Sequence, residues 1–364
     1  MTPNRTERLP VSPFLARRVW PVAVAIALAF SIPLSARAMT TPALVVDVDS
    51  GAVLFAQDAG RPWYPASTTK LMTALVTFEA LAAGEVTLET PVVMSKKAMR
   101  QESLHAGLSV GRAMRLEDAL YAAFAASAND VAIALAQTVA GNETAFVARM
   151  NATAKRLGMN ASHFANANGL FDSGQHVSAR DLAILAMTID KRFPQYRPIF
   201  GTSRVIVDGQ AVDSFNALLT RYPGTVGMKT GFLCAAGRNI VALAERGGRR
   251  VMVVLLGATT DRERAERAAM LLTQAFAGEL KPTGLSVGQI QDQPSQRPED
   301  MRVRLCTSQS QAYEAKQARL YPMGIGSNPS YLDVPRAGHT RTIHTWAVNY
   351  PVDPPLPAAK PSTH

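Results

Sequence analysis

Ser67 and Lys70 stand three residues apart at the start of an apolar stretch, and this pair constrains the fold more than any other feature of the chain. Trp63–Ala66 ends in a turn, and Leu71–Val76 is apolar enough for a buried helix. Helix positions three apart share a face, so the hydroxyl and the amine would point into one space. A helix N-terminus also favours a developing anion. The pattern predicts a serine activated by a lysine, and a serine that only caps the helix is the alternative.

A second polar motif, Ser127-Ala128-Asn129, follows about 60 residues after Ser67. It lies within Tyr121–Ala136, an alanine-rich apolar stretch that predicts a buried helix or a helix-to-helix turn. Buried polar side chains need partners, so this motif is a candidate part of a site.

A third motif, Lys229-Thr230-Gly231, precedes Arg238–Ala244, which has the pattern of a strand. Glycine at that point lets another backbone or a ligand approach closely. The order S-x-x-K, S-x-N, K-T-G is typical of penicillin-binding proteins and serine β-lactamases.

The sequence around the motifs resembles the low-molecular-mass D-alanyl-D-alanine carboxypeptidases over roughly residues 43 to 277. The stretch Gly169–Asp181 is especially similar to that family, and we find no Glu-containing deacylation loop of the class A β-lactamases there. Four runs carry the resemblance: YPASTTKLMTALVTFEAL, AASANDVAIALAQTVAG, KRLGMNASHFANANGLFDSGQHVSARDLAILA and VGMKTGFLCAAGRNIVALAERGGRRVMVVLLGA.

The resemblance implies a serine carboxypeptidase that trims the terminal D-alanine from peptidoglycan stem pentapeptides through an acyl-enzyme on Ser67. It implies Lys70 as the general base and Ser127 as a proton relay, with β-lactam antibiotics as acylating inhibitors. The implied substrate-binding residues are Asn129, Lys229, Thr230, Gly231, Phe232 and Arg264. For Arg264, a solvent-exposed helix charge is the alternative. For the whole chain, the alternatives are a D,D-endopeptidase, a β-lactamase or a non-catalytic peptidoglycan-binding relative.

Two hairpin patterns frame a long helical region that runs from Thr69 to about Thr188. If both hairpins share one antiparallel sheet, the helical region is a lobe inserted into it, and the site lies between lobe and sheet. The resemblance implies an α/β fold of the β-lactamase/transpeptidase type, with a five-stranded antiparallel sheet flanked by helices. The hairpin strands are Leu44–Asp47 with Ala52–Ala56, and Val241–Ala244 with Val251–Leu256; Arg262–Phe276 predicts a closing amphipathic helix.

The N-terminal 38 residues have the pattern of a secretory signal peptide, with early arginines, an apolar run from Val19 to Leu34 and Ala36-Arg37-Ala38 as the cleavage signal. A retained membrane anchor is the alternative. We expect an exported protein of the periplasm or cell envelope. Residues 39–280 would form the catalytic domain and residues 281–300 a linker. Residues 301–364 would form an extension without an assigned fold, with strand-like pieces at Met301–Leu305 and Thr342–Val348.

Charge and composition argue against several other classes of function. The N-terminal 38 residues hold five arginines and one glutamate, so the rest of the chain keeps +6 of the net charge of +10. That basic excess is spread out with few interleaved aromatic residues, which disfavours nucleic-acid binding. The six histidines are scattered, so we expect no metal, and no glycine-rich phosphate loop predicts a cofactor. The Pro-rich tail, residues 350–364, does not predict the anchoring helix of relatives, so no clear membrane anchor remains after signal cleavage.

Cys234 and Cys306 are the only cysteines in the chain. Export to an oxidising compartment would favour a disulfide between them, which would tie the C-terminal segment to the catalytic sheet. Two separate thiols, with Cys234 a small buried residue, are an equal alternative.

Overall fold

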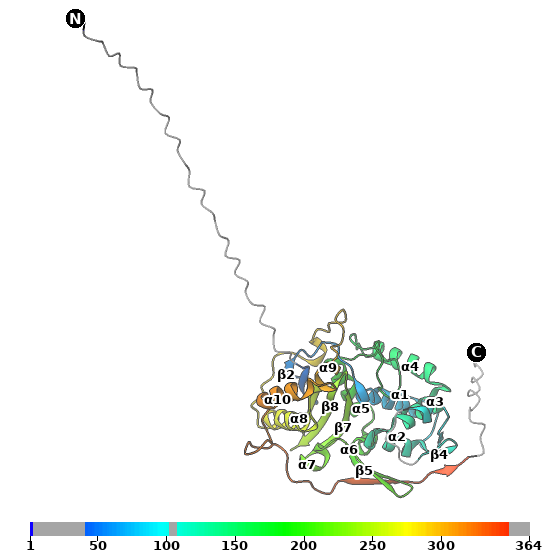
Figure 1. The fold of residues 1–364 in the computed structure, drawn as a ribbon. Helices are drawn as coiled ribbons and strands as arrows, with labels where there is room; N and C mark the ends of the chain where they lie inside the picture. The colour runs from blue at the N-terminus through cyan, green and yellow to red at the C-terminus, as the bar shows by residue number, and fades with distance from the viewer. Residues whose placement is uncertain (3–40, 102–107, 349–364) are drawn as a thin grey trace. The chain divides into compact units, whose positions relative to one another are not determined.

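The computed structural model describes residues 1–2, 41–101 and 108–348 (Figure 1). The predicted signal peptide beyond Thr2 and the Pro-rich tail therefore lie outside the described residues.

A five-stranded antiparallel sheet with strand order β2-β1-β9-β8-β7 is the centre of the fold. Both predicted hairpins, β1–β2 and β8–β9, are confirmed and share this sheet. The β7 strand lies at its edge. The bounds of the strands are β1 Ala43–Asp47, β2 Val53–Gln57, β7 Thr225–Leu233, β8 Gly237–Arg246 and β9 Arg249–Ala258.

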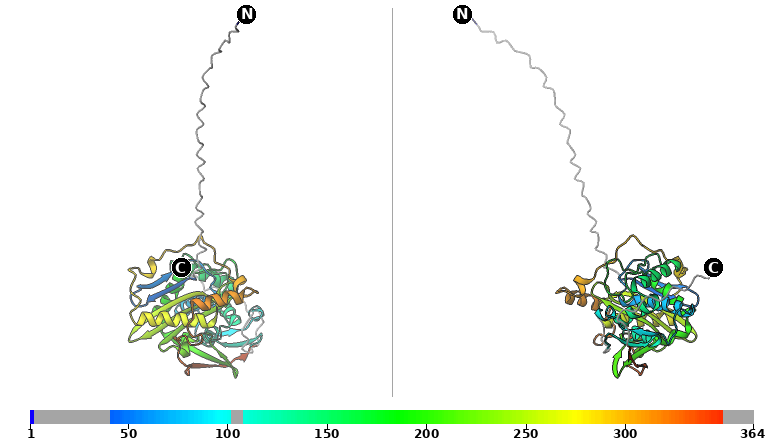
Figure 2. Two further views of the ribbon diagram at one scale, coloured as in Figure 1. Left: turned by 60° about the vertical axis from the view of Figure 1, so that its left-hand side comes forward. Right: turned by 90° about the vertical axis from the view of Figure 1, so that its right-hand side faces the viewer.

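Both faces of this sheet are buried, which explains why its central strands are continuous apolar runs rather than alternating ones. In β9, Met252 and Val254 join the core on the side of the helical lobe, whereas Val251 and Val253 join the core under the helix α8 (Asp261–Phe276). Figure 2 shows α8 lying across the sheet. On the opposite face, α5 (Ala179–Arg192) packs against β1 and β9.

The predicted helical lobe is inserted between β2 and β7 and contains helices and short strands (Figure 1). A 3₁₀ helix, η1 (Ala66–Thr69), runs directly into α1. The other helices of the lobe are α1 Lys70–Ala82, η2 Ala98–Arg100, α2 Leu116–Ala125, α3 Asn129–Ala140, α4 Glu143–Arg156, η3 Pro194–Tyr196, α6 Arg197–Gly201 and α7 Leu218–Arg221. The short strands are β3 Pro91–Val93, β4 Arg112–Arg115, β5 Thr202–Val207 and β6 Gln210–Asp213.

Residues 281–348, which we call the strap, lie along the catalytic domain. The segment predicted as a linker hydrogen-bonds to β2, where Val53 N–H donates to Leu285 O and Thr283 N–H donates to Val53 O. Further along, Asp292 forms a buried ion pair with Arg180 of α5. The elements of the strap are η4 Val287–Gln289, α9 Arg302–Leu305, α10 Ser310–Leu320, β10 His339–Ile343 and β11 Trp346–Ala347.

The strap strands extend two small sheets of the lobe instead of forming a sheet of their own. The β10 strand pairs in parallel with β5, and β11 pairs antiparallel with β4 (Figure 1). The prediction of a strand-like piece at Met301–Leu305 is wrong, because Arg302–Leu305 forms α9. Asp300 accepts the Arg302 N–H, which starts a helical turn that is too short for its apolar pattern to reveal.

Within the described residues, no single helix combines the length and hydropathy that a membrane span requires; α3 and α4 meet the criterion only as a pair, across an 84° bend.

Candidate active site

Ser67 lies in the 3₁₀ turn η1, and two glycines pack closely against this turn. The preceding residue, Ala66, has a left-handed φ of 49°. A Cβ atom on Gly231 of β7 would lie 2.8 Å from the Ser67 nitrogen, and a Cβ atom on Gly169 would lie 2.0 Å from the Ala66 oxygen. Only residues without a Cβ atom let these two segments approach the Ser67 turn so closely.

Asn239 of β8 anchors the approach to this turn. Its Nδ2 atom donates to the carbonyl oxygens of Tyr64 and Pro65, each at 2.9 Å, and its Oδ1 atom accepts the Gly257 N–H at 2.9 Å. One fully buried amide therefore connects the central strands to the segment that presents Ser67.

The Lys70 amine is fully buried one turn after Ser67 (0% exposed). Its Nζ atom lies 3.1 Å from Ser67 Oγ, 2.7 Å from Asn129 Oδ1 and 2.7 Å from Asn168 O. Burial, and next the charge of Lys229, lower the pKa of Lys70 well below its usual value, although Asp130 opposes the shift. A neutral amine has two N–H groups and one lone pair. The two carbonyl oxygens take both N–H groups, so the lone pair is left for the Ser67 hydroxyl.

Ser127 and Lys229 form a second polar pair beside the first. Ser127 lies in the turn between α2 and α3 with a φ of 56°, so the predicted helix-to-helix turn is confirmed. The Lys229 Nζ atom donates to Ser127 Oγ at 2.9 Å and to Thr230 O at 2.9 Å. Burial and the charge of Arg264 lower the pKa of Lys229 to about 7. This lysine can therefore change its charge near neutral pH.

A cavity of about 240 Å³, which we call the catalytic cavity, opens onto these groups. Seven of the nine site residues predicted from the sequence line it, and Lys70 and Lys229 lie directly behind its wall. Its lining residues are Ser67, Ser127, Asn129, Phe215, Thr230, Gly231, Phe232, Arg238, Asp261 and Arg264.

Arg264 is buried in the first turn of α8, at 3% exposure, so the alternative of a solvent-exposed helix charge is wrong. Its Nη2 atom donates to Phe215 O at 2.6 Å, and its Nη1 atom lies 3.0 Å from the Asp261 carboxylate. Its Nε atom is buried without a hydrogen-bond partner among the described residues. Burial lowers the pKa of Arg264 to about 10, so the side chain stays cationic at neutral pH.

Sequence analysis missed several residues of the site. Asn168 contributes a backbone carbonyl to Lys70, a role that side-chain identity cannot reveal. The Asn-Gly pair at 168–169 is a turn signal that could have drawn attention to this loop. Phe215, Arg238 and Asp261 reach the cavity from three different segments and belong to no local motif.

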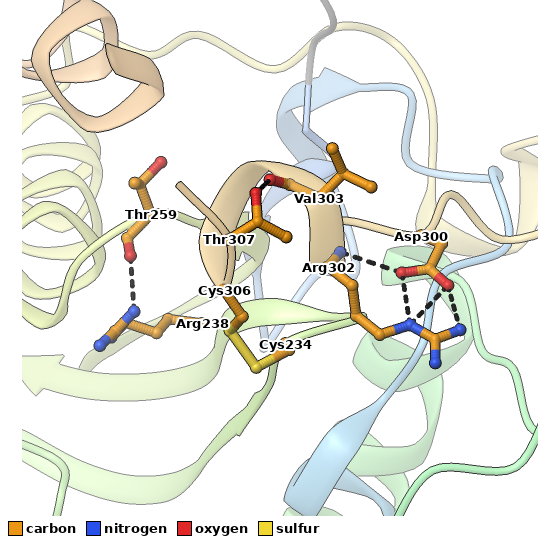
Figure 3. Close-up of a disulfide and its surroundings, with 8 residues drawn as sticks. All are labelled: Cys234, Arg238, Thr259, Asp300, Arg302, Val303, Cys306 and Thr307. Atoms are coloured by element: carbon orange, nitrogen blue, oxygen red, sulfur yellow. Dashed lines mark hydrogen bonds and ion pairs between the residues drawn. A yellow bond between two sulfur atoms is a disulfide. The ribbon is translucent and has the colours of Figure 1, made fainter. Parts of the chain in front are cut away.

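The Cys234–Cys306 pair forms a disulfide, which decides between the two alternatives left by the sequence (Figure 3). The bond joins the turn after β7 to the residue that directly follows α9 of the strap. In the same region, the Arg302 guanidinium lies 4.6 Å from the ring centre of Phe171, and that ring lies 5.3 Å from the ring of Tyr64. The disulfide thus fixes the strap near the segment that leads to Ser67.

Among the described residues, no group of three or more His, Cys, Asp or Glu side chains has the arrangement of a metal site. The polar side chains that line the cavity, or lie directly behind its wall, carry hydroxyls, amines, an amide, guanidinium groups and one carboxylate. They suit acyl transfer on a serine.

Comparison with known proteins identifies the family of the chain. The sequence profile of a peptidase family described as D-alanyl-D-alanine carboxypeptidase matches residues 31–260. The chain belongs to this family. Among carboxypeptidases of this name, DacF of Bacillus subtilis is 32% identical over 240 residues, 65% of this chain and 61% of DacF. DacC of Escherichia coli is 35% identical over 241 residues, 64% of this chain and 60% of DacC.

Solved structures of penicillin-binding proteins share the fold. The ampicillin-bound crystal structure of penicillin-binding protein D2 from Listeria monocytogenes matches with a TM-score of 0.58 and 30% identity, over 64% of this chain and 95% of that one. The predicted transpeptidase-like α/β fold is thereby confirmed. The chain spans only about 60% of the length of these curated carboxypeptidases.

Proposed function

We propose that the protein is a serine-type D-alanyl-D-alanine carboxypeptidase of the cell envelope, which removes the terminal D-alanine from peptidoglycan stem pentapeptides. The placement of Lys70 Nζ between Ser67 Oγ and two carbonyl oxygens is the observation that carries this proposal. In its neutral form, this buried amine has one function left, which is to accept a proton from the serine hydroxyl.

In the first step, Ser67 Oγ attacks the carbonyl carbon of the penultimate D-alanine while its proton passes to Lys70. The backbone N–H groups of Ser67 and Phe232 stabilise the developing oxyanion, at about 3 kcal/mol for each such donor. The bond to the terminal D-alanine then breaks. Ser127 relays a proton to the leaving amine, and its contact with Lys229 orients its hydroxyl. Water afterwards hydrolyses the ester and regenerates Ser67.

The cationic end of the cavity accounts for recognition of a free C-terminus. Lys229, Thr230 and Arg264 bind the terminal carboxylate, and Asn129 binds the amide of the substrate. Asp261 is the single carboxylate among the described residues that line the cavity, and it faces Arg238 and Arg264.

β-Lactams would act as acylating inhibitors because they mimic the D-alanyl-D-alanine end, and the ampicillin-bound relative supports this expectation. Mass spectrometry after incubation with penicillin should find one acyl group, on Ser67, together with release of D-alanine from a stem pentapeptide. Ser67→Ala should abolish both results. Thr69→Ala is a matched control, since the Thr69 hydroxyl has no hydrogen-bond partner within the described residues. An acyl group on another serine, or none, would contradict the proposal.

A further inference from the structure

The catalytic cavity contains a carboxylate of its own beside the arginine that binds the substrate carboxylate in the proposed function. This carboxylate belongs to Asp261, the first residue of α8, and it lines the cavity together with Arg238 and Arg264. The Asp261 side chain is 63% exposed, whereas that of Arg264 is only 4% exposed. A ligand that enters the cavity therefore meets an accessible anion next to a nearly covered cation.

Asp261 bridges the two arginines. Its Oδ1 atom lies 3.0 Å from Arg264 Nη1, and its Oδ2 atom lies 3.0 Å from Arg238 Nε. One oxygen thus faces each guanidinium group, which is a favourable position for a negative charge. The same Coulomb interaction repels a second carboxylate from this position.

Arg264 has little capacity for another anion while Asp261 is in place. Its Nη2 atom donates to Phe215 O at 2.6 Å, and its Nε atom has no accessible surface. The remaining nitrogen, Nη1, is the one that faces Asp261. A substrate carboxylate can form a charge-assisted contact with this nitrogen only beside the Asp261 carboxylate or in its place. Repulsion between the two carboxylates favours replacement.

The arginines are held by other contacts, whereas Asp261 is free to move. Arg238 Nη1 donates to Thr259 O at 2.5 Å (Figure 3), and the guanidinium carbon lies 4.5 Å from the ring centre of Phe232. Arg264 is fixed by its burial. Among the described residues, the two arginines are the polar partners of the Asp261 carboxylate. A mostly exposed carboxylate held by ion pairs gives them up at small cost.

We propose that Asp261 is a built-in competitor for the substrate carboxylate, which occupies Arg264 in the free protein and yields it when the C-terminus of a stem peptide binds. This inference rests on the proposed function. Asp261 acts through the arginines, so it is a positioning residue that sets the affinity for ligands with a free carboxylate. The apparent affinity falls in proportion to the time for which Asp261 occupies Arg264. As free D-alanine leaves, Asp261 returns to the arginines.

A structural role of Asp261 is the alternative. An acidic residue in the first turn of a helix stabilises the helix through its dipole, and an ion pair with Arg264 could also hold that side chain in place. The two roles predict effects of opposite sign. Removing a competitor tightens the binding of a carboxylate, whereas removing a support of Arg264 weakens it.

The test removes the charge of Asp261 and keeps the size of its side chain. With Asp261→Asn, kcat/KM on a stem pentapeptide should rise about threefold to tenfold through a lower KM, while kcat changes less than twofold. Asp213→Asn is the matched control. Asp213 is similarly exposed, at 66%, and pairs with Arg204 at 2.6 Å, but it does not line the catalytic cavity. This variant should change neither kcat nor KM.

Calorimetry on Ser67→Ala protein separates this inference from the proposed function, because it requires no turnover. Adding Asp261→Asn should tighten the binding of the pentapeptide acid about threefold to tenfold and leave the binding of its C-terminal amide unchanged. Unchanged or weaker binding of the acid would overturn the role of Asp261 even if D-alanine release is normal, and so would equal tightening for acid and amide. Selective tightening for the acid, without D-alanine release by the wild-type protein, would instead overturn the proposed function alone.

Discussion

The Nζ atom of Lys70 lies 2.7 Å from the backbone carbonyl oxygen of Asn168, a residue 98 positions later in the chain. Together with Asn129 Oδ1, this carbonyl occupies the donors of a neutral amine and directs its lone pair to Ser67. In the proposed mechanism, the loop that carries Asn168 thereby helps to activate the serine through its backbone.

The first prediction concerns the charge of Lys70. Lys70→Arg should lower the rate of acylation by penicillin by orders of magnitude, because a guanidinium group is not deprotonated in proteins. Stopped-flow or mass-spectrometric acylation rates measure the effect, and circular dichroism checks that the fold survives. Normal acylation of the arginine variant would mean that another group is the base.

The second prediction concerns pH. With a pKa of about 7, Lys229 loses its charge as the pH rises above neutrality, and its attraction for the terminal carboxylate weakens. We expect kcat/KM on a stem pentapeptide to fall on the alkaline side of about pH 7, since this parameter reports ionisation of the free enzyme. Lys229→Arg supplies the control, because a guanidinium group stays charged and should remove the alkaline fall. An identical fall in that variant would assign it to a different group.

The third prediction concerns the loop against the Ser67 turn. Gly169→Ala should destabilise the protein by about 2–4 kcal/mol and slow acylation, because the new Cβ atom meets the Ala66 carbonyl in addition to straining the backbone. Gly84→Ala is the matched control, since Gly84 has a φ of 69° but open space around it. It should cost about 1 kcal/mol. Urea unfolding and acylation rates measure both, and equal effects would show that backbone strain alone matters.

The fourth prediction concerns the disulfide. Cys234 and Cys306 are separated by 72 positions, and on the chain-entropy model closing such a loop contributes about 4 kcal/mol. Reduction should therefore lower the urea midpoint of the wild-type protein. The Cys234→Ser/Cys306→Ser double variant should start lower and not respond to reductant. Two free thiols in the unfolded, unreduced protein would contradict the bond.

The sequence by itself determined the parts of this protein that depend on local order. The spacing of Ser67 and Lys70, the three ordered motifs and the apolar runs of the hairpins identify the family, the sheet and most of the lysine and serine groups. These features are readable because residue identity and short-range periodicity set them, and because the motifs carry their own side-chain chemistry.

Only the tertiary structure decided what depends on contacts between distant segments. Separate elements meet where the Asn168 carbonyl contacts Lys70, where Arg264 is buried and where Phe215 lines the catalytic cavity. The strands of the strap are another example, because they pair with β4 and β5. The sequence of the strap does not encode where β4 and β5 lie in space. Every residue type can form backbone hydrogen bonds, and many can pack closely, so such contacts leave little trace in the sequence. Only the positions of distant segments in space therefore bring these residues into the site.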